Sequence, residues 1–288
     1  MQTLRWRIGD VEIIQIFEVD AGPIIEDILP QATPQKIKEI TWLYPHFADE
    51  EGRLKAVVQA FVVITPNHRI IVDTCVGNHK PRGHTPLWNM MKTDFLARLE
   101  SAGCAPETID TVLCTHLHYD HIGWNTMLRD GRWVPTFPNA KYLFSEKEYE
   151  YWRTHPKKEA IDDHYGFADS VTPVVEAGLA ELVGLDYVIG EHVSLIPTPG
   201  HTPGHVCVLV SSRGAQAVIT GDAMHHPCQI AHPDWSAEGD SDQDRAKQSR
   251  EALFERFAGT KTLIIGSHFA APTAGKLERH GNGFKFIV

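Results

Sequence analysis

Three histidines and one aspartate lie within six residues of one another in this chain, at His116, His118, Asp120 and His121. Imidazole nitrogen and carboxylate oxygen are ligands that suit Zn(II) and similar divalent ions, and core packing does not call for so many of them in one turn. The alternative interpretation is a run of solvated surface histidines. We predict instead that this turn is part of a two-metal hydrolytic centre.

The spacing within this turn divides the four side chains into two pairs. His116 and His118 are two residues apart, so in extended backbone they point the same way and can share one ion. Asp120 and His121 follow where the chain curls, and they can reach a second ion. The preceding run Thr111–Cys114 is apolar and β-branched, which predicts a buried strand with the histidines at its carboxyl end.

Three further candidate ligands follow apolar runs in the second half of the chain. His201 lies in a Pro/Gly-rich loop (TPGHTPGH, 198–205) that can fix a side chain at little entropic cost. Asp222 follows the predicted strand 217–220 and can bridge two cations, and His268 follows the predicted strand 262–265. We expect these strand ends to converge on the 116–121 turn.

With these residues in place, the chain resembles the metallo-β-lactamase superfamily, whose HxHxDH motif matches residues 116–121 without a gap. The resemblance extends from the strand end at 71–74 to His268, and it is strongest to the N-acyl homoserine lactonases and the methyl parathion hydrolases. It implies an α/β fold of the αββα type, with two mixed β-sheets packed face to face and helices on their outer faces. It also implies one metal held by His116, His118 and His201, a second held by Asp120, His121 and His268, and Asp222 shared between them.

The overall pattern of the 288 residues predicts one domain, 1–288, because no linker divides the chain and the candidate ligands come from both halves. The runs 57–65 and 69–73 predict a hairpin of buried strands. Apolar residues at helical spacing predict helices over Met90–Ala102, Glu146–His155 and Gln243–Phe257.

The composition restricts the partners and the compartment. Acidic residues outnumber basic ones by 37 to 27, and no arginine-rich stripe offsets the net charge of −10, so nucleic acid is not expected as a partner. We find no apolar stretch long enough for a membrane span and no secretory signal in the first ten residues. The five cysteines lack CxxC spacing, which favours reduced thiols and a cytoplasmic protein. A homodimer remains open.

A pair of divalent ions lowers the pKa of a bound water to about 7, so that a metal-bridging hydroxide can attack a carbonyl or phosphoryl centre. We therefore predict two divalent metal ions as cofactors, with Zn(II) favoured and Mn(II), Fe(II) or Co(II) as alternatives. The predicted function is a hydrolase that opens a lactone or cleaves a carboxylic ester. Asp120 is assigned to ligation first and to alignment of the nucleophile second.

Position 225 bears on the substrate. Lactonases of the homoserine lactone type carry a tyrosine three residues after the bridging aspartate, whereas this chain has His225, which resembles the parathion hydrolase pattern. We predict that His225 is a catalytic residue that donates a hydrogen bond to the substrate oxygen. The alternative is that His225 or His226 only supports the loop. Phosphotriester hydrolysis is the second candidate function, and a metal-binding protein without turnover is the third.

Other residues near the motif have structural or supporting interpretations. Asp73 either accepts an N–H from a metal-bound histidine or is an ordinary carboxylate at a strand end. The polar loop 77–86 could form a lid over the metals, with His79 and His84 solvated. Each of Trp88, Trp124 and Trp152 is more readily explained as core than as a wall of the substrate site.

Overall fold

The computed structural model describes residues 3–154 and 161–288, and most of their strands form two seven-stranded sheets. The first sheet has the order β1 (Arg5–Ile8), β2 (Val11–Asp20), β3 (Val57–Ile64), β4 (Arg69–Val72), β5 (Thr111–Leu113), β8 (Lys141–Ser145) and β9 (Ala180–Val183). The second has the order β10 (Val188–Ile189), β11 (Val193–Pro197), β12 (Val206–Ser212), β13 (Ala215–Ile219), β14 (Leu263–Ile265), β15 (Ala274–His280) and β16 (Gly283–Ile287). A separate hairpin joins β6 (Thr126–Arg129) to β7 (Arg132–Pro135).

The two sheets pack face to face because alternate residues of their strands are apolar on the inner face. Ile13 and Phe61 of the first sheet belong to the same buried cluster as Val208 and Ile219 of the second. Neighbouring residues such as Ile14 point to the opposite face and belong to a second cluster, which includes the helices. Both sheets contain parallel and antiparallel pairs, so the predicted mixed sheets are confirmed.

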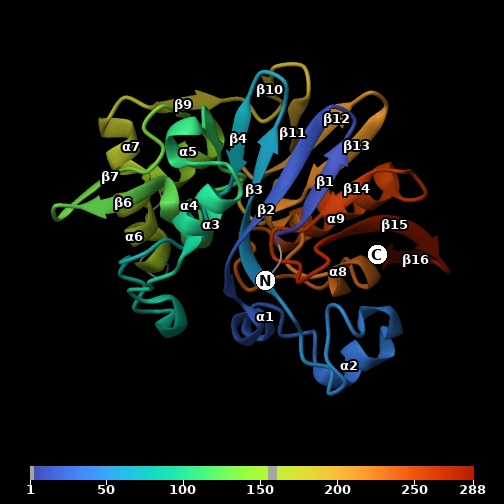
Figure 1. The fold of residues 1–288 in the computed structure, drawn as a ribbon. Coiled ribbons are helices and arrows are strands. Elements are labelled where there is room, and N and C mark those ends of the chain that lie inside the picture. Colours follow the sequence, from blue (N-terminus) through green and yellow to red (C-terminus); the bar gives the residue numbers. More distant parts are fainter. Residues whose placement is uncertain (1–2, 155–160) are drawn as a thin grey trace.

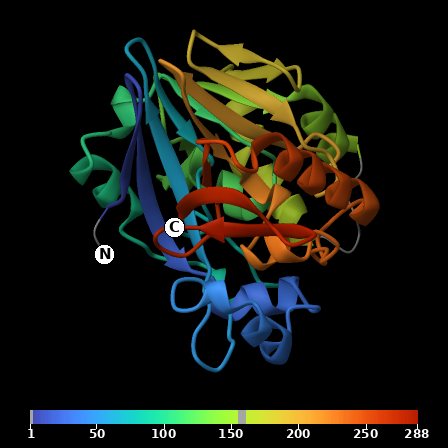
Figure 2. The same ribbon diagram turned by 90° about the vertical axis from the view of Figure 1, so that its right-hand side faces the viewer.

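Helices cover the outer faces. Figure 1 shows α3 to α7 grouped on one side of the strands and α8 and α9 on the other, with α1 and α2 below. Figure 2 shows the orange-red α9 on the outside of the second sheet. This is the predicted αββα arrangement. The helices are α1 (Gly22–Ile28), α2 (Pro34–Glu39), α3 (Phe95–Ser101), α4 (Tyr119–Ile122), α5 (Glu146–Thr154), α6 (Ile161–Ser170), α7 (Thr172–Glu176), α8 (Cys228–Ala231) and α9 (Gln243–Phe257), with short 3-10 turns η1 (Thr41–Leu43), η2 (Pro86–Trp88), η3 (Pro106–Thr108), η4 (Gly123–Asn125) and η5 (Gly221–Ala223).

The helix predictions hold to different degrees. α9 has the predicted bounds, and the Asp242 side chain caps it by accepting the N–H of Arg245 at 2.9 Å. α5 also begins where predicted, and the predicted last residue, His155, lies outside the described residues.

The predicted helix Met90–Ala102 is wrong at its start, because α3 begins only at Phe95. Met90 has a φ of +55° and donates its N–H to the carbonyl of Lys80 at 2.8 Å, while Met91 accepts the N–H of His79 at 2.9 Å. The segment therefore pairs with the preceding loop and not with a helical turn.

That loop, 77–86, is anchored to the protein interior, which the prediction of a polar lid did not anticipate. The side chains of Lys80 and Arg82 are fully buried. Arg82 forms a two-pronged pair with the Asp169 carboxylate, at 2.7 and 3.0 Å, and Lys80 donates to the Thr126 hydroxyl at 2.6 Å. Burial lowers the pKa of Lys80 to about 7. Of the two histidines expected to be solvated, His84 is exposed and His79 is half-buried.

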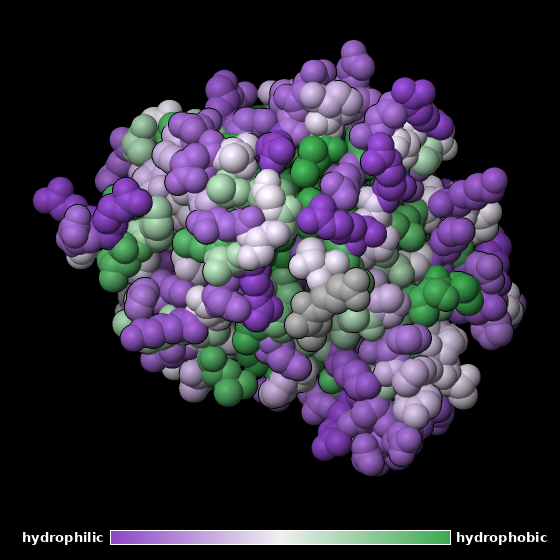
Figure 3. Space-filling view, viewed as in Figure 1, coloured by the Kyte–Doolittle hydropathy of each residue, from purple (hydrophilic) through white to green (hydrophobic). Residues whose placement is uncertain are grey.

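The surface is predominantly polar on the face shown in Figure 3, with apolar side chains in separate patches. All five cysteines are free and buried, which agrees with the prediction of reduced thiols. Among the described helices, none combines the length and the apolarity needed to cross a bilayer.

Candidate metal centre

The candidate ligands emerge at one edge of the sandwich because of the strand directions. β4 runs parallel to β5, and β13 runs parallel to β14. β11 has the same direction as β13, because each of them is antiparallel to β12. The loops after β5, β11, β13 and β14 lie at this edge, and they bring together all seven predicted ligands. These ligands form two groups, one of His116, His118, His201 and Asp222 and the other of Asp120, His121 and His268.

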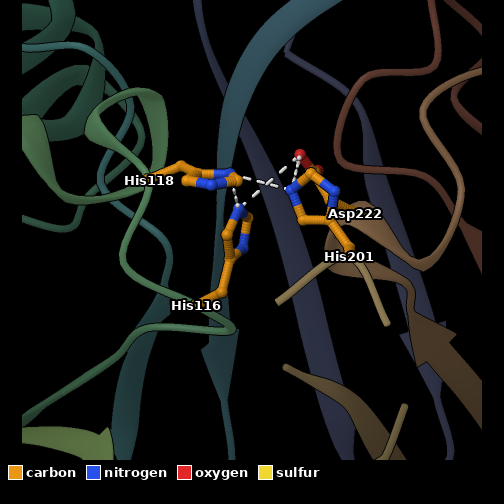
Figure 4. Close-up of side chains that lie close together, drawn as sticks. All are labelled: His116, His118, His201 and Asp222. Atoms are coloured by element: carbon orange, nitrogen blue, oxygen red, sulfur yellow. Dashed lines mark hydrogen bonds and ion pairs between the residues drawn. The ribbon is translucent and has the colours of Figure 1, made fainter. Parts of the chain in front are cut away.

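The first group is compact (Figure 4). His116 and His118 reach in from one side and His201 and Asp222 from the other. His118 Nδ1 lies 2.9 Å from His116 Nε2 and 2.8 Å from His201 Nε2. Three ring nitrogens of three different histidines therefore surround a single point.

The second group lies on the other side of Asp222. His121 Nε2 and His268 Nε2 are 3.1 Å apart, and Asp120 Oδ2 is 3.7 and 3.6 Å from these two atoms. The two oxygens of Asp222 face different groups. Oδ2 is 3.4 Å from His201 Nε2, whereas Oδ1 is 3.2 Å from His121 Nε2 and 3.1 Å from His268 Nε2. This is the geometry that a bridging carboxylate requires.

Partners outside the centre fix the tautomers of these imidazoles. His121 Nδ1 lies 2.9 Å from an Asp73 oxygen, His201 Nδ1 lies 2.9 Å from an Asp240 oxygen, and His268 Nδ1 lies 2.9 Å from the Val57 carbonyl. Each acceptor holds the proton on Nδ1, so each Nε2 presents a lone pair to the centre. Of the two interpretations of Asp73, the contact with His121 supports the one in which it orients a candidate ligand.

Several inward lone pairs within about 3 Å repel one another unless a cation lies among them. The donor set of imidazole nitrogens and carboxylate oxygens suits a divalent transition metal. Asp222 Oδ1 also makes no hydrogen bond, although it is buried. The residues therefore fit two divalent ions, and the assignment of individual ligands stays a prediction.

The electrostatics of the centre favour anionic carboxylates beside cations. Burial works against ionisation of Asp222, but His121 and His268 lower its pKa well below the ordinary value. Burial also disfavours charge on His121, yet in the metal-free protein Asp222, Asp120 and Asp73 raise its pKa well above the ordinary value, so a bound cation would take the place of the proton on Nε2. Burial lowers the pKa of His201 to about 4. A neutral imidazole such as that of His201 is the form that binds a metal.

His225 and His226 have different surroundings. His226 is fixed by the backbone, because its Nε2 lies 2.9 Å from the Phe47 carbonyl and its Nδ1 accepts the N–H of Cys228 at 3.1 Å. His225 faces the centre, with Nε2 3.2 Å from Asp222 Oδ2, and its Nδ1 is buried without a hydrogen-bond partner. The loop-supporting role therefore belongs to His226, and the predicted substrate contact of His225 remains a prediction.

A hollow of about 180 Å³ opens onto the candidate ligands. Its other walls are His225, Gly239 and the apolar or aromatic side chains of Ile28, Trp88 and Tyr119. Trp88 is buried yet lines this hollow, so the assignment to core alone was incomplete. Trp124 and Trp152 belong to the buried core, and the Trp152 ring lies edge-on to His118 at 5.4 Å between centroids.

Sequence reasoning missed several residues that hold the centre in place. His205 accepts the backbone N–H of Asp222 at 2.9 Å through Nε2, and burial lowers its pKa to about 3. Asp240 and Glu148 support the loops of the first group. His205 is at least visible in the repeated TPGH pattern, and Glu148 shares a helix face with Trp152 four residues later. No local pattern identifies Asp240.

Comparison with models of known protein families identifies the family of this chain. The model of the Metallo-beta-lactamase superfamily matches residues 55–268, which include all seven candidate ligands. The chain belongs to this superfamily. The resemblance inferred from the HxHxDH motif is thereby confirmed.

Individual relatives are more distant. The N-acyl homoserine lactonase AttM of Azorhizobium caulinodans is 28% identical over 230 residues, a match that covers 73% of this chain and 81% of AttM. An N-acyl homoserine lactonase of Bacillus cereus is 27% identical over 130 residues, and this match spans only 43% of its length.

Among solved structures, the dizinc quorum-quenching lactonase AidC, in complex with a product, superposes with a TM-score of 0.80 at 22% identity and with coverage of 99% of this chain and 96% of AidC. The hydrolase AbOPH, of the beta lactamase superfamily, has a TM-score of 0.78 at 26% identity, and the match covers 99% of this chain and 96% of AbOPH. At these identities the structural matches support the fold.

Proposed function

We propose that this chain is a hydrolase that uses two divalent metal ions, with zinc favoured, to open a lactone or cleave a carboxylic ester. The observation that carries the proposal is the division of the Asp222 carboxylate, whose two oxygens face two separate groups of ligands. One ion does not need such an arrangement. The family and the named lactonases among the relatives support the same reaction class.

Two bound divalent ions would lower the pKa of a water molecule and polarise the oxygen of the bond under attack. The residues of this chain hold and orient the reactants. Asp120, which lines the hollow, helps to align the nucleophile in addition to its predicted ligation. His225 lies on the hollow wall, where its ring can donate a hydrogen bond to the substrate oxygen.

The walls of the hollow favour a substrate with an apolar portion beside its reactive group. Ile28, Trp88 and Tyr119 present aliphatic and aromatic surface next to the ligands. None of these three side chains carries a fixed charge, so an uncharged ester or lactone fits this surface better than a polyanion does.

Phosphotriester hydrolysis is the second candidate. It is favoured by one observation, the presence of His225 on the wall of the hollow at the position where homoserine lactonases carry tyrosine. The same metal pair can serve attack at phosphorus or at carbon, so the groups that line the hollow decide between the two substrates.

The test is a panel of lactones, aryl esters and a phosphotriester, assayed with purified protein before and after chelation, together with elemental analysis. We expect about two divalent ions per chain, hydrolysis that chelation abolishes and zinc restores, and higher kcat/KM for a carbonyl substrate than for the phosphotriester. Two bound ions without any hydrolysis would support the metal-binding alternative. One ion or fewer in well-folded protein after incubation with excess zinc would refute the two-metal proposal.

A further inference from the structure

Two buried carboxylates outside the predicted ligand set hold the loops of the candidate metal centre. Glu148 on α5 and Glu18 on β2 are 1% and 4% exposed, respectively. Neither carboxylate is neutralised by a buried lysine or arginine in the described contacts. Each instead accepts backbone N–H groups from a loop that carries or supports candidate ligands, together with one tryptophan indole N–H.

Glu148 connects the two loops of the first group. Its Oε1 accepts the N–H of Leu117 at 3.2 Å, and its Oε2 accepts the N–H of Gly204 at 2.9 Å. Leu117 lies between His116 and His118, and Gly204 follows His201 by three residues. A single carboxylate therefore ties together the backbone segments that present all three histidines of this group.

The contacts around Glu148 leave little freedom. A Cβ atom on Gly204 would lie 2.4 Å from the Glu148 backbone nitrogen, so the loop packs directly on the first turn of α5. Trp152 donates its indole N–H to Glu148 Oε1 at 2.6 Å and packs its ring against His118. Glu148 thus fixes both the backbone and the aromatic wall of the first group.

Glu18 plays the corresponding part beside the second group. Its Oε2 accepts the N–H of Val76 at 2.7 Å, and its Oε1 accepts the Trp124 indole N–H at 2.6 Å. Val76 follows Asp73, the partner of His121, and Trp124 follows His121 by three residues. A Cβ atom on Gly123 would lie 1.8 Å from the Val76 carbonyl oxygen, so these two segments are in direct backbone contact.

We propose that Glu148 and Glu18 are positioning residues with separate targets: Glu148 holds the His116–His118–His201 site, and Glu18 holds the Asp120–His121–His268 site through Asp73. The inference rests on the proposed two-metal function and assigns one supporting carboxylate to each ion. Outer hydrogen bonds of this kind typically change metal affinity by roughly 10- to 100-fold.

Glutamine is a sharp probe of this role, because it keeps the shape of glutamate and replaces one acceptor oxygen by an NH₂ donor. In Glu148→Gln the amide can still accept from Leu117 and Trp152, but its NH₂ then faces the N–H of Gly204. In Glu18→Gln the NH₂ similarly faces the N–H of Val76. Each change is therefore expected to loosen one loop only.

The experiment measures Co(II) affinity at each site separately, by chelator competition and visible absorption. His268→Ala leaves the first site intact, and His118→Ala leaves the second. In the His268→Ala background we expect Glu148→Gln to weaken Co(II) binding by about 10- to 100-fold and to alter the Co(II) spectrum. In the same background, Glu18→Gln should change the Co(II) affinity by less than about threefold. In the His118→Ala background we expect the opposite pattern.

Glu146→Gln is the matched control, because Glu146 is exposed on the same helix and should change neither affinity. If Glu148→Gln does not fold, Trp152→Phe removes one of its donors and should give a smaller loss at the first site only. Equal losses at both sites, or no loss at either, would overturn the separate assignment. Two outcomes separate this inference from the proposed function. If wild-type protein binds two Co(II) ions and hydrolyses esters but the variants show no site preference, only the positioning roles are overturned. If wild-type protein binds fewer than two Co(II) ions, the proposed function is overturned as well.

Discussion

Asp222→Ala is the most informative single change, because the carboxylate faces both ligand groups. It is 3% exposed and lies between His201 on one side and His121 and His268 on the other. Removal of one partner from a buried charged contact costs about 3–5 kcal/mol. At 1.4 kcal/mol per tenfold, this corresponds to a loss of roughly two to four orders of magnitude in metal affinity.

We therefore expect Asp222→Ala to retain at most one ion per chain after dialysis and to lose hydrolysis of every substrate in the panel. The assay is elemental analysis paired with kcat/KM, with circular dichroism as a check of folding. His225→Ala is the matched control, because His225 contacts Asp222 Oδ2 at 3.2 Å but does not belong to the predicted ligand set. It should keep two ions and lose less activity. Equal losses in the two variants, with both ions retained in Asp222→Ala, would refute the bridging role.

Three further changes test the surrounding structure. His225→Phe should slow lactone cleavage by about tenfold or more, the order expected for one positioned donor, whereas His225→Tyr should keep much of the rate; unchanged kinetics in the phenylalanine variant would exclude the donor role. Asp169→Asn leaves Lys80 and Arg82 buried without a carboxylate, so urea unfolding should show a loss of about 3–5 kcal/mol. Glu181→Gln, which removes the half-buried partner of the exposed Lys141, should cost about 0–1 kcal/mol. Burial lowers the pKa of His226 to about 4, so its contribution to the free energy of unfolding is present above about pH 6.5 and is lost as the pH falls towards 4. In metal-free protein, the loss of unfolding free energy caused by His226→Gln should therefore shrink by about 2 kcal/mol between pH 7 and pH 5. A loss that stays constant over this range would contradict the buried neutral form.

The regular elements were largely predictable because their signals are local. Apolar patterning predicts the strand before the HxHxDH turn and the full extent of α9. It also predicts the strands that lead to His201, Asp222 and His268. The start of α3 was not predictable in this way. Met90 and Met91 have acceptable helical propensities, but their backbone groups bond to the loop at His79 and Lys80, a contact that patterning does not encode.

The candidate ligand set could be inferred from the sequence because each ligand follows a strand-like run, and the chemistry of imidazole and carboxylate narrows the interpretation. The supporting residues could not. Glu148 is a glutamate in a charged helix, and Asp240 lies in a loop without any motif. Their roles arise because distant segments bring N–H groups or an imidazole against a carboxylate that has lost its water.

The sequence by itself determined the family and the residue types of the candidate ligands, since residue identity and short-range spacing are properties of the chain. The division into two groups was already predicted from the spacing and the resemblance, but only the tertiary structure shows how Asp222 lies between them. The two oxygens of Asp222 face two groups because β5 of one sheet and β13 and β14 of the other end at the same edge. The buried supports Glu18 and Glu148 likewise depend on contacts between residues far apart in sequence, whose free energy comes from burial and hydrogen bonding that no local pattern specifies.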